Sequence, residues 1–340
     1  MNCVIVLLRV RVCTDAHLSY DTRYADVSTR SDVRLRLPLL PKISSRLQIG
    51  VPTTAKEKKM APQVIRAATY LSPGIPVEFF QAVLDYLEQR LDVHTTLIYE
   101  SRWFGPPADR RDPFAHGDVD IAFMSPLAFV RMHDSGNEHI ELLPVSSVHE
   151  HLKGGNDTGH FADVIINADL KAASVDSFEM LRGCRWAYTG PESFSGNQIT
   201  LQVLKRRGET ATFFGNKLRS KSHLDSIYMV LNKQVDAAAV DANCLALFFD
   251  RNPSYKDKVF VIESWGSLPP YPIVVRKALP QETKLALKDA LLEMSEFSEG
   301  AKQLAQYRVK RFAPVSMDQF LAFKEDVRET TKLTFDSVYY

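Results

Sequence analysis

Short apolar runs alternate with amphipathic stretches along the chain after residue 60. The run over residues 64–70 (VIRAATY) has the composition of a strand, and a cluster of helix breakers at 72–76 follows it. Apolar side chains then recur at positions 79, 80, 83, 84 and 87, which is the spacing of one helix face. This part of the chain therefore predicts a strand, a loop and an amphipathic helix.

The same alternation continues to about residue 297. The pattern predicts strands over 93–99, 119–124, 141–148, 162–167, 184–189, 235–241, 258–263 and 271–275, and helices over 126–133, 175–182, 197–207, 223–232 and 281–297. Strands that alternate with helices indicate an α/β protein with mostly parallel sheets. Such folds bind ligands where strands end and helices begin.

The charge of residues 1–59 differs from that of the rest of the chain. The 340 residues carry a formal net charge of +1, but residues 1–59 hold 11 Lys or Arg against 5 Asp or Glu, leaving 31 against 36 in the rest. A body of net −5 argues against nucleic acid as a partner. Since no run of about 18 apolar residues occurs, we expect no direct membrane insertion. The length favours about two domains.

The basic segment over residues 1–60 resembles no complete targeting signal. Its apolar stretch at residues 3–8 is cut short by Arg9 and Arg11, so it is too short for a secretory signal. Four aspartates before residue 33 interrupt the basic segment, whereas an organellar transit peptide is poor in acidic residues. We expect a basic extension that is disordered or not native, with the native protein starting at Met60. The missing signal peptide favours a cytoplasmic location.

The body has two cysteines, Cys184 and Cys244, which make no disulfide framework and no zinc spacing. His149, His151 and His160 flank a glycine-rich loop, and we expect them to be solvated because no zinc-binding helix motif accompanies them. No Gly-x-Gly-x-x-Gly follows the first strand. The sequence therefore predicts neither a metal nor a cofactor.

Three strand-to-helix turns carry candidate chemistry. Ser125, followed by Pro126, is either an ordinary helix cap or an anion contact. Ser193, Ser195 and Gly196 offer hydroxyls and free amides at a helix start, which suits an oxyanion, although a plain Ser-Gly turn has the same composition.

The third turn is Ser222-His223, where Ser222 is placed to cap a helix and His223 stands in its first turn. The imidazole there is either a ligand contact or a surface residue. Asp241 ends the strand over 235–241, where it either faces a ligand or caps the next turn.

Taken in order, these turns resemble the phosphate/phosphonate-binding branch of the type II periplasmic substrate-binding proteins of ABC transporters. The matching stretches are YLSP (70–73), GDVDIAFMSP (117–126), LRGCRWAY (181–188), SFSG (193–196), SHLDSI (222–227), VDAAAVD (235–241) and PYPIVVR (270–276). The resemblance covers roughly residues 63–297.

The resemblance implies two α/β lobes joined by two crossing strands, near 161–167 and 271–275, with the ligand clamped between the lobes. Lobe 1 would comprise residues 61–166 and 272–340, and lobe 2, inserted, residues 167–271. It implies a non-enzymatic binding protein for a small oxyanion, with an ABC transporter permease as a further partner. A transport role would place the protein in the periplasm or outside the cell.

The residues carried over from the family fall into three groups. The phosphoryl group would be held by Ser125, Ser193, Ser195, Gly196, Ser222 and His223. Tyr70 matches an aromatic position lining the cleft, and Asp241 an acid facing the other end of the ligand, where an amino group is a candidate partner. The departures are Phe194 and Asn197 in the Ser-Gly turn, and Lys221 where glycine is common.

Two enzymatic alternatives remain on the same fold. Ser195, His223 and Asp241 are the residue types of a hydrolytic triad, but the chain has neither the α/β-hydrolase order nor its Gly-x-Ser-x-Gly motif. A biosynthetic protein of the thiamine-pyrimidine type would need a cysteine-rich motif, which Cys184 and Cys244 do not supply.

Overall fold

The computed structural model describes residues 63–72, 74–100, 105–330 and 333–335, and the basic extension expected over residues 1–60 lies outside this part. The described residues belong to one compact unit, Pro62–Tyr340. Within them, no helix has the length and apolar character that crossing a bilayer requires.

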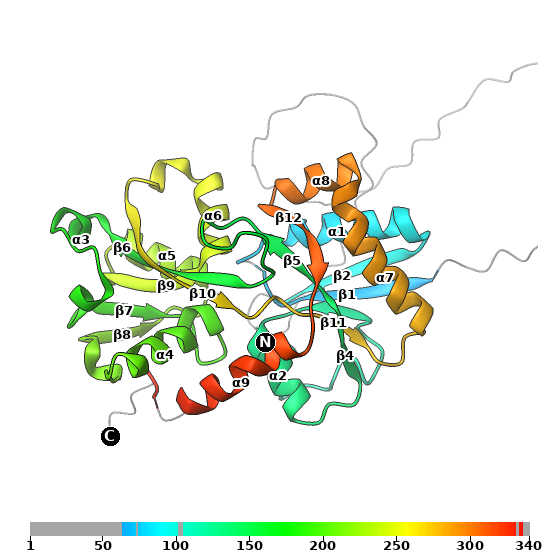
Figure 1. The fold of residues 1–340 in the computed structure, drawn as a ribbon, viewed down its shortest axis with the longest axis horizontal. Helices are drawn as coiled ribbons and strands as arrows, with labels where there is room; N and C mark the ends of the chain where they lie inside the picture. Colours follow the sequence, from blue (N-terminus) through cyan, green and yellow to red (C-terminus); the bar gives the residue numbers. More distant parts are fainter. Residues whose placement is uncertain (1–62, 73, 101–104, 331–332, 336–340) are drawn as a thin grey trace, which may run out of the picture. The chain divides into compact units, whose positions relative to one another are not determined.

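The first sheet has the strand order β2-β1-β3-β11-β4, and we call it with its helices the first lobe (Figure 1). Its strands are β1 (Val64–Thr69), β2 (His94–Tyr99), β3 (Ile121–Phe123), β4 (Ile140–Leu143) and β11 (Ile273–Arg276). Its helices are α1 (Val77–Leu91), α2 (Pro126–Asp134), α7 (Gln281–Glu293) and α8 (Ser298–Ala305), with the 3-10 turn η5 (Met294–Glu296). The face of α1 that the sequence predicted is the buried one.

The second sheet has the order β10-β6-β9-β7-β8 and forms, with its helices, the second lobe. Its strands are β6 (His160–Asn167), β7 (Arg185–Tyr188), β8 (Asn216–Arg219), β9 (Ala237–Asp241) and β10 (Val259–Leu268). Its helices are α3 (Ala168–Ala172), α4 (Ile199–Arg206), α5 (His223–Leu231) and α6 (Ala242–Arg251). Shorter turns are η1 (Phe178–Leu181), η2 (Phe194–Gln198), η3 (Ala211–Phe213) and η4 (Pro253–Tyr255).

Both sheets mix strand directions, so the expectation of mostly parallel sheets was wrong. β1 runs parallel to β2 and β3, and β7 runs parallel to β8 and β9. The exceptions are the strands next to the connections between the lobes. β11 is antiparallel to both of its neighbours, and so is β6. These two strands enter their sheets from the other lobe rather than through a helix of the same lobe.

Two segments connect the lobes. One runs from β5 (Val145–His149) to β6, and the other runs from the end of β10 to the start of β11. β6 begins at His160, ahead of the boundary expected at residue 167. The predicted strand over 141–148 is two strands, because β4 stays in the first sheet while β5 pairs with β12 (Val309–Pro314).

Several elements differ from the sequence prediction. The helix predicted over 175–182 is only the short turn η1, while β8, α3, α6, α8, β12 and α9 were not predicted. α9 (Asp318–Thr330) reaches both lobes (Figure 1). Phe320 stacks edge-on against Phe129 of α2, and Phe323 against Phe194 of the second lobe. Through these contacts α9 packs against both lobes.

A buried carboxylate holds the first sheet at its centre. Asp120, 1% exposed, receives Arg66 Nε at 2.8 Å and Arg276 Nη2 at 2.8 Å, so it joins β1, β3 and β11. Burial alone would raise the pKa of Asp120, but the hydrogen bonds from Arg66 and Arg276 outweigh it, and the pKa lies below its ordinary value. In the second sheet, Asp236 pairs with Arg185 in a similar way but is 20% exposed.

We expect Asp120→Asn to lower the free energy of unfolding by about 3 kcal/mol, because it breaks a buried ion pair on one side. Asp236→Asn, the more exposed counterpart, should cost about 1 kcal/mol. Because the folded pKa of Asp120 is depressed, its contribution is present above the unfolded pKa near 4 and is lost as pH falls through the folded value. Urea unfolding of both variants at pH 7 and pH 3 measures this. Equal losses in the two variants at pH 7 would contradict the assignment.

Candidate functional site

A cavity of about 660 Å³, counting its open mouth, lies between the two lobes. Residues of both lobes line it, and seven of the eight predicted site residues are among them: Tyr70, Ser125, Ser193, Ser195, Ser222, His223 and Asp241. Further lining residues that the sequence did not single out as site residues include Ser72, His160, Cys244 and Tyr271. The structure thus brings together turns from five separate strand ends, those of β1, β3, β7, β8 and β9.

Ser125 forms the first-lobe wall of the cavity. It follows β3 and caps α2, where its Oγ accepts the N–H of Ala128 at 3.2 Å. Pro126 fills the first helical position, as the sequence predicted. The hydroxyl proton of Ser125 is not required for this cap, since the cap uses the oxygen as an acceptor. Ser125 can therefore cap the helix and donate into the cavity at the same time.

The second turn leaves β7 through a widened, π-helical turn, η2, before α4 begins. Ser193 Oγ accepts the N–H of Gly196 at 3.1 Å and fixes the turn. Ser193, Ser195 and Asn197 are all buried. The first N–H groups of a helix lack partners within the helix and carry its positive end. Turns of this π type recur at functional sites.

Gly196 does not line the cavity but makes the turn fit. A Cβ at this position would lie 2.3 Å from Thr189 Oγ1 and 2.9 Å from His223 Cε1. Only glycine allows the second turn to approach the third this closely. Its role is thus packing behind the cavity wall.

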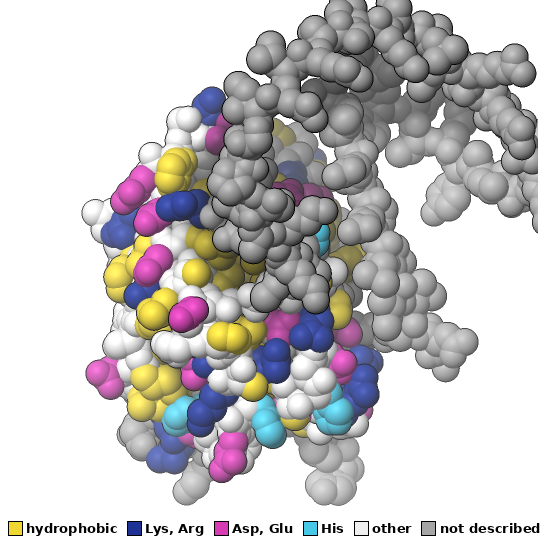
Figure 2. Space-filling view, turned by 90° about the vertical axis from the view of Figure 1, so that its right-hand side faces the viewer, with side chains coloured by type: hydrophobic (Ala, Val, Ile, Leu, Met, Phe, Trp, Pro, Cys, Tyr) yellow, Lys and Arg dark blue, Asp and Glu magenta, His cyan; other side chains and the backbone are white. Residues whose placement is uncertain are grey.

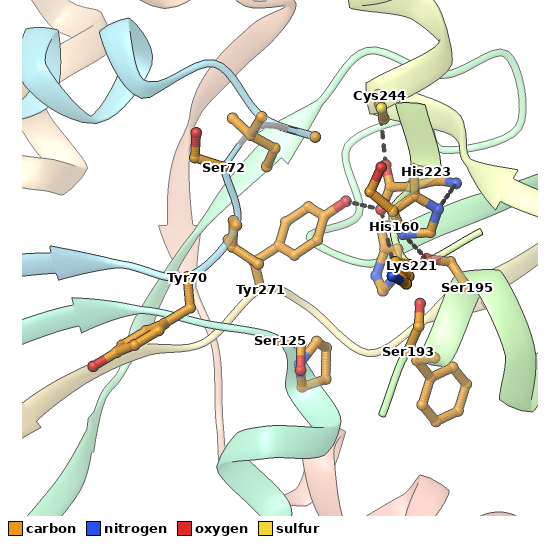
Figure 3. A pocket seen from close by; sticks show the side chains of 17 residues that line it. Tyr70, Ser72, Ser125, His160, Ser193, Ser195, Lys221, His223, Cys244 and Tyr271 are labelled. Atoms are coloured by element: carbon orange, nitrogen blue, oxygen red, sulfur yellow. Dashed lines mark hydrogen bonds and ion pairs between the residues drawn. The ribbon is translucent and has the colours of Figure 1, made fainter. Parts of the chain in front are cut away.

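His223, at the start of α5, has a fixed proton arrangement. Its Nδ1 accepts the backbone N–H of Asp241 at 3.1 Å, so the proton of the neutral ring is on Nε2. Nε2 lies 3.5 Å from Ser195 Oγ at the cavity wall (Figure 3). Burial lowers the pKa of His223, which favours this neutral form. His223 therefore presents an N–H donor beside the Ser195 hydroxyl.

Ser222 is less available than the other serines. Its Oγ accepts the N–H of Asp225 at 3.0 Å and donates to the Asp225 carboxylate at 2.7 Å. Its proton is therefore already used within the cap of α5, although the residue lines the cavity.

Asp241 ends β9 and caps α6. Its Oδ1 accepts the N–H groups of Asn243 at 2.9 Å and Cys244 at 3.2 Å, and its Oδ2 accepts the hydroxyl of Tyr271 in a short hydrogen bond. Burial works to raise the pKa of Asp241, but His160, His223 and these donors bring it below its ordinary value. Asp241 is an ionised group with several donors of its own.

The aromatic ring that reaches the centre of the site belongs to Tyr271, not to Tyr70. Figure 3 shows the Tyr70 hydroxyl turned away from the other labelled side chains. The Tyr70 ring packs in an apolar cluster of the first lobe with Phe114 and Met124. Tyr271 lies on the connection between β10 and β11 rather than in a strand-to-helix turn, so the sequence pattern did not single it out.

The expectation that the three loop histidines are solvated was wrong. His149 and His160 are buried, and His151 stacks on Phe161 with ring centres 4.2 Å apart. Burial lowers the pKa of His149 to about 4. His160 stacks on Tyr271 at 4.6 Å and lines the cavity. Their position in the sequence could have indicated burial, because His149 and His160 stand at the two ends of a segment that connects the lobes.

Lys221 lies in the left-handed region with φ +77°, a conformation that favours glycine. In the family that the sequence resembles, glycine is common at this position. Lys221 lines the cavity and forms no ion pair with another of the described residues. A strained residue at a cavity is typical of a functional position.

The arrangement suits binding of an oxyanion and not hydrolysis. A hydrolytic histidine must accept the serine proton on Nε2, but here Nε2 carries a proton because Nδ1 is an acceptor. The Asp241 carboxylate contacts Tyr271 and the α6 amides instead of His223 Nδ1. Burial raises the pKa of Cys244 well above its usual value, so this residue is a thiol. Within the described residues, no group of three or more His, Cys, Asp or Glu is arranged to hold a metal ion.

The fold and site define a two-lobed α/β protein with a cavity lined by helix starts. A sequence model of the family described as "ABC transporter, phosphonate, periplasmic substrate-binding protein" matches residues 66–320. The chain belongs to this family of type II periplasmic binding proteins, whose members bind solutes and are not enzymes.

Solved structures show the same fold. A binding protein component of an ABC phosphonate transporter from Pseudomonas aeruginosa has a TM-score of 0.66 at 22% identity, covering 79% of this chain and 88% of its own. PhnD1 from Prochlorococcus marinus, in complex with methylphosphonate, has a TM-score of 0.65 at 17% identity, covering 80% and 100%. XAC2383 from Xanthomonas citri, bound to ATP, has a TM-score of 0.58 at 17% identity, covering 80% and 99%.

We expect ¹⁵N NMR to find the proton of neutral His223 on Nε2 and that of His160 on Nδ1, because their Nδ1 atoms bond to an N–H and a carbonyl respectively. The lowered pKa predicts that His223 stays neutral below pH 6.5. His→Gln variants assign the signals. A proton on Nδ1 of His223, or an imidazolium already at pH 7, would be inconsistent with the site.

Proposed function

We propose that the cavity binds a small phosphonate, phosphate or related phosphoryl compound and delivers it to an ABC transporter permease. One observation carries the proposal: Ser195 Oγ and the N–H of His223 converge at 3.5 Å on a helix start between the lobes. A tetrahedral oxyanion needs several donors on one side, and helix-start amides supply more of them. Family membership and the methylphosphonate complex of PhnD1 support the same ligand class.

Attraction of the ligand would be local to the site. On the face of the described residues drawn in Figure 2, basic and acidic side chains are interspersed, and neither sign forms a continuous patch there. This face therefore gives an anion little long-range steering. The donors at the helix starts, together with Lys221, then supply the affinity.

Closure of the lobes would complete the site. Ser125 comes from the first lobe, whereas Ser195 and His223 come from the second. A ligand that bonds to both lobes stabilises the closed arrangement by its extra contacts in that state. A permease could then recognise the closed form, which no single lobe displays.

We expect methylphosphonate, phosphate or phosphite to raise the melting temperature, with an affinity reduced about 10- to 100-fold in Ser195→Ala and in His223→Ala. Each substitution removes a hydrogen bond to a charged group, worth about 1.5–3 kcal/mol. Ser135→Ala, which removes an exposed hydroxyl that bonds to Met132 O, is the control. Isothermal titration calorimetry provides the dissociation constants. Flat titrations of the wild type with all three ligands would refute the proposed function.

We expect Lys221→Gly to have opposite effects on stability and binding. Glycine relieves the left-handed strain, which should stabilise the fold by about 0.5–1 kcal/mol. Loss of the cation should weaken phosphonate binding about fivefold.

Lys233→Gly is the matched control for this prediction. Lys233 also has a positive φ, +57°, but pairs with Asp169 away from the cavity. Its replacement should leave phosphonate affinity unchanged. Unchanged affinity in Lys221→Gly as well would show that Lys221 does not act on the ligand.

A further inference from the structure

His160 is a buried polar side chain at the cavity. Its Nδ1 forms a hydrogen bond within the fold, whereas its Nε2 forms none with the described residues. Its Nδ1 lies 2.6 Å from the carbonyl oxygen of Pro269. A carbonyl only accepts, so Nδ1 carries the proton and donates. Nε2 of the neutral ring is then a bare acceptor. The side chain of His160 is only 2% exposed.

This acceptor lies close to a second acceptor. Nε2 of His160 lies 3.9 Å from Oδ2 of Asp241. Two acceptors cannot hydrogen-bond to each other, and none of the described residues donates a hydrogen bond to Nε2. Tyr271 donates to Asp241 Oδ2, and its ring stacks on His160. The packing thus leaves an acceptor open to the cavity, next to the carboxylate.

The rest of the site supplies the opposite kind of group. Ser195 Oγ–H and His223 Nε2–H are donors, and Lys221 is a cation. An anion without a proton satisfies these donors but leaves His160 Nε2 facing an anionic oxygen. A ligand that covers this acceptor without giving it a hydrogen-bond partner should bind about 5- to 150-fold more weakly. A ligand that carries one proton on its oxyanion satisfies both walls.

We propose that His160 is a specificity-determining residue that accepts a hydrogen bond from a proton-bearing phosphoryl oxygen, so that the cavity selects the singly protonated phosphonate or phosphate. This rests on the proposed function and names the ligand form. A residue of this kind would favour binding of phosphonates over sulfonates and sulfate, which have the same tetrahedral shape but carry no proton near neutral pH.

The groups facing His160 fit this assignment. Asp241 stands beside it from β9, His223 from α5, His149 from β5, and Tyr271 from the connection to β11. Burial lowers the pKa of His160, and of His149 and His223, so these rings are neutral at pH 7. Asp241 is ionised and already receives Tyr271. Nothing in this group donates toward the cavity at Nε2.

The test uses two substitutions that each keep one nitrogen position of His160. The amide of Asn reaches the Nδ1 position and keeps the bond to Pro269, whereas the amide of Gln reaches the Nε2 position and keeps an acceptor there. We expect His160→Asn to weaken methylphosphonate binding about tenfold or more, and His160→Gln to retain most of it. A purely structural role of the Pro269 bond predicts the reverse order.

The pH profile and an isostere give a second readout. Wild-type affinity should fall about tenfold per pH unit above the second pKa of the ligand, because the binding-competent fraction of the ligand falls in that proportion. When Nε2 of His160 gains a proton at acidic pH, below the ordinary 6.5, it becomes a donor, and the preference for the singly protonated ligand should disappear. In His160→Asn the alkaline slope should flatten. Methanesulfonate should bind at least about 100-fold more weakly than methylphosphonate.

His116 is the matched control, since its Nδ1 also bonds to a backbone carbonyl, Asp112 O at 2.9 Å, outside the cavity. Its Asn and Gln variants should bind like the wild type. Equal binding of methylphosphonate and methanesulfonate, or unchanged affinity in His160→Asn, would overturn the inference while leaving the proposed function intact. So would a dependence on His160 for 2-aminoethylphosphonate alone, because the donor would then be the ammonium. Absence of binding by any phosphoryl compound would instead refute the proposed function.

Discussion

The hydrogen bond from the backbone N–H of Asp241 to Nδ1 of His223 determines how this site works. It joins the end of β9 to the start of α5 and puts the imidazole proton on Nε2. That proton makes His223 a donor to an anion and prevents it from acting as a base toward Ser195. A catalytic triad and an anion site thus share residue types but differ in the position of one proton.

Hydrogen-bond donors and acceptors lie in different parts of the site. Helix starts in both lobes present hydroxyl and amide donors, while the connections between the lobes bring His160 and Tyr271 against Asp241. Those connections are also where the lobes join. The acceptors of the site, His160 Nε2 and the Asp241 carboxylate, therefore lie beside the connections between the lobes. A bound ligand would therefore contact both lobes and the joint between them, which couples recognition to closure.

The sequence predicted the parts of the site that are local. Ser125, Ser195 and His223 stand where a strand pattern gives way to a helix pattern, and this order places each of them at the carboxyl edge of its own lobe's sheet. His160 and Tyr271 were missed because their position depends on the pairing of segments far apart in the sequence. The same limit explains the wrong expectation of mostly parallel sheets, since β6 and β11 take their direction from the crossing between lobes.

A crystal structure with methylphosphonate tests the central claim most directly. The account predicts the phosphoryl group between the lobes, with oxygens about 2.7–3.0 Å from Ser195 Oγ and His223 Nε2 and a third oxygen in hydrogen-bond reach of His160 Nε2. A ligand found outside this cavity, or one whose phosphoryl oxygens contact neither Ser195 nor His223, would contradict it.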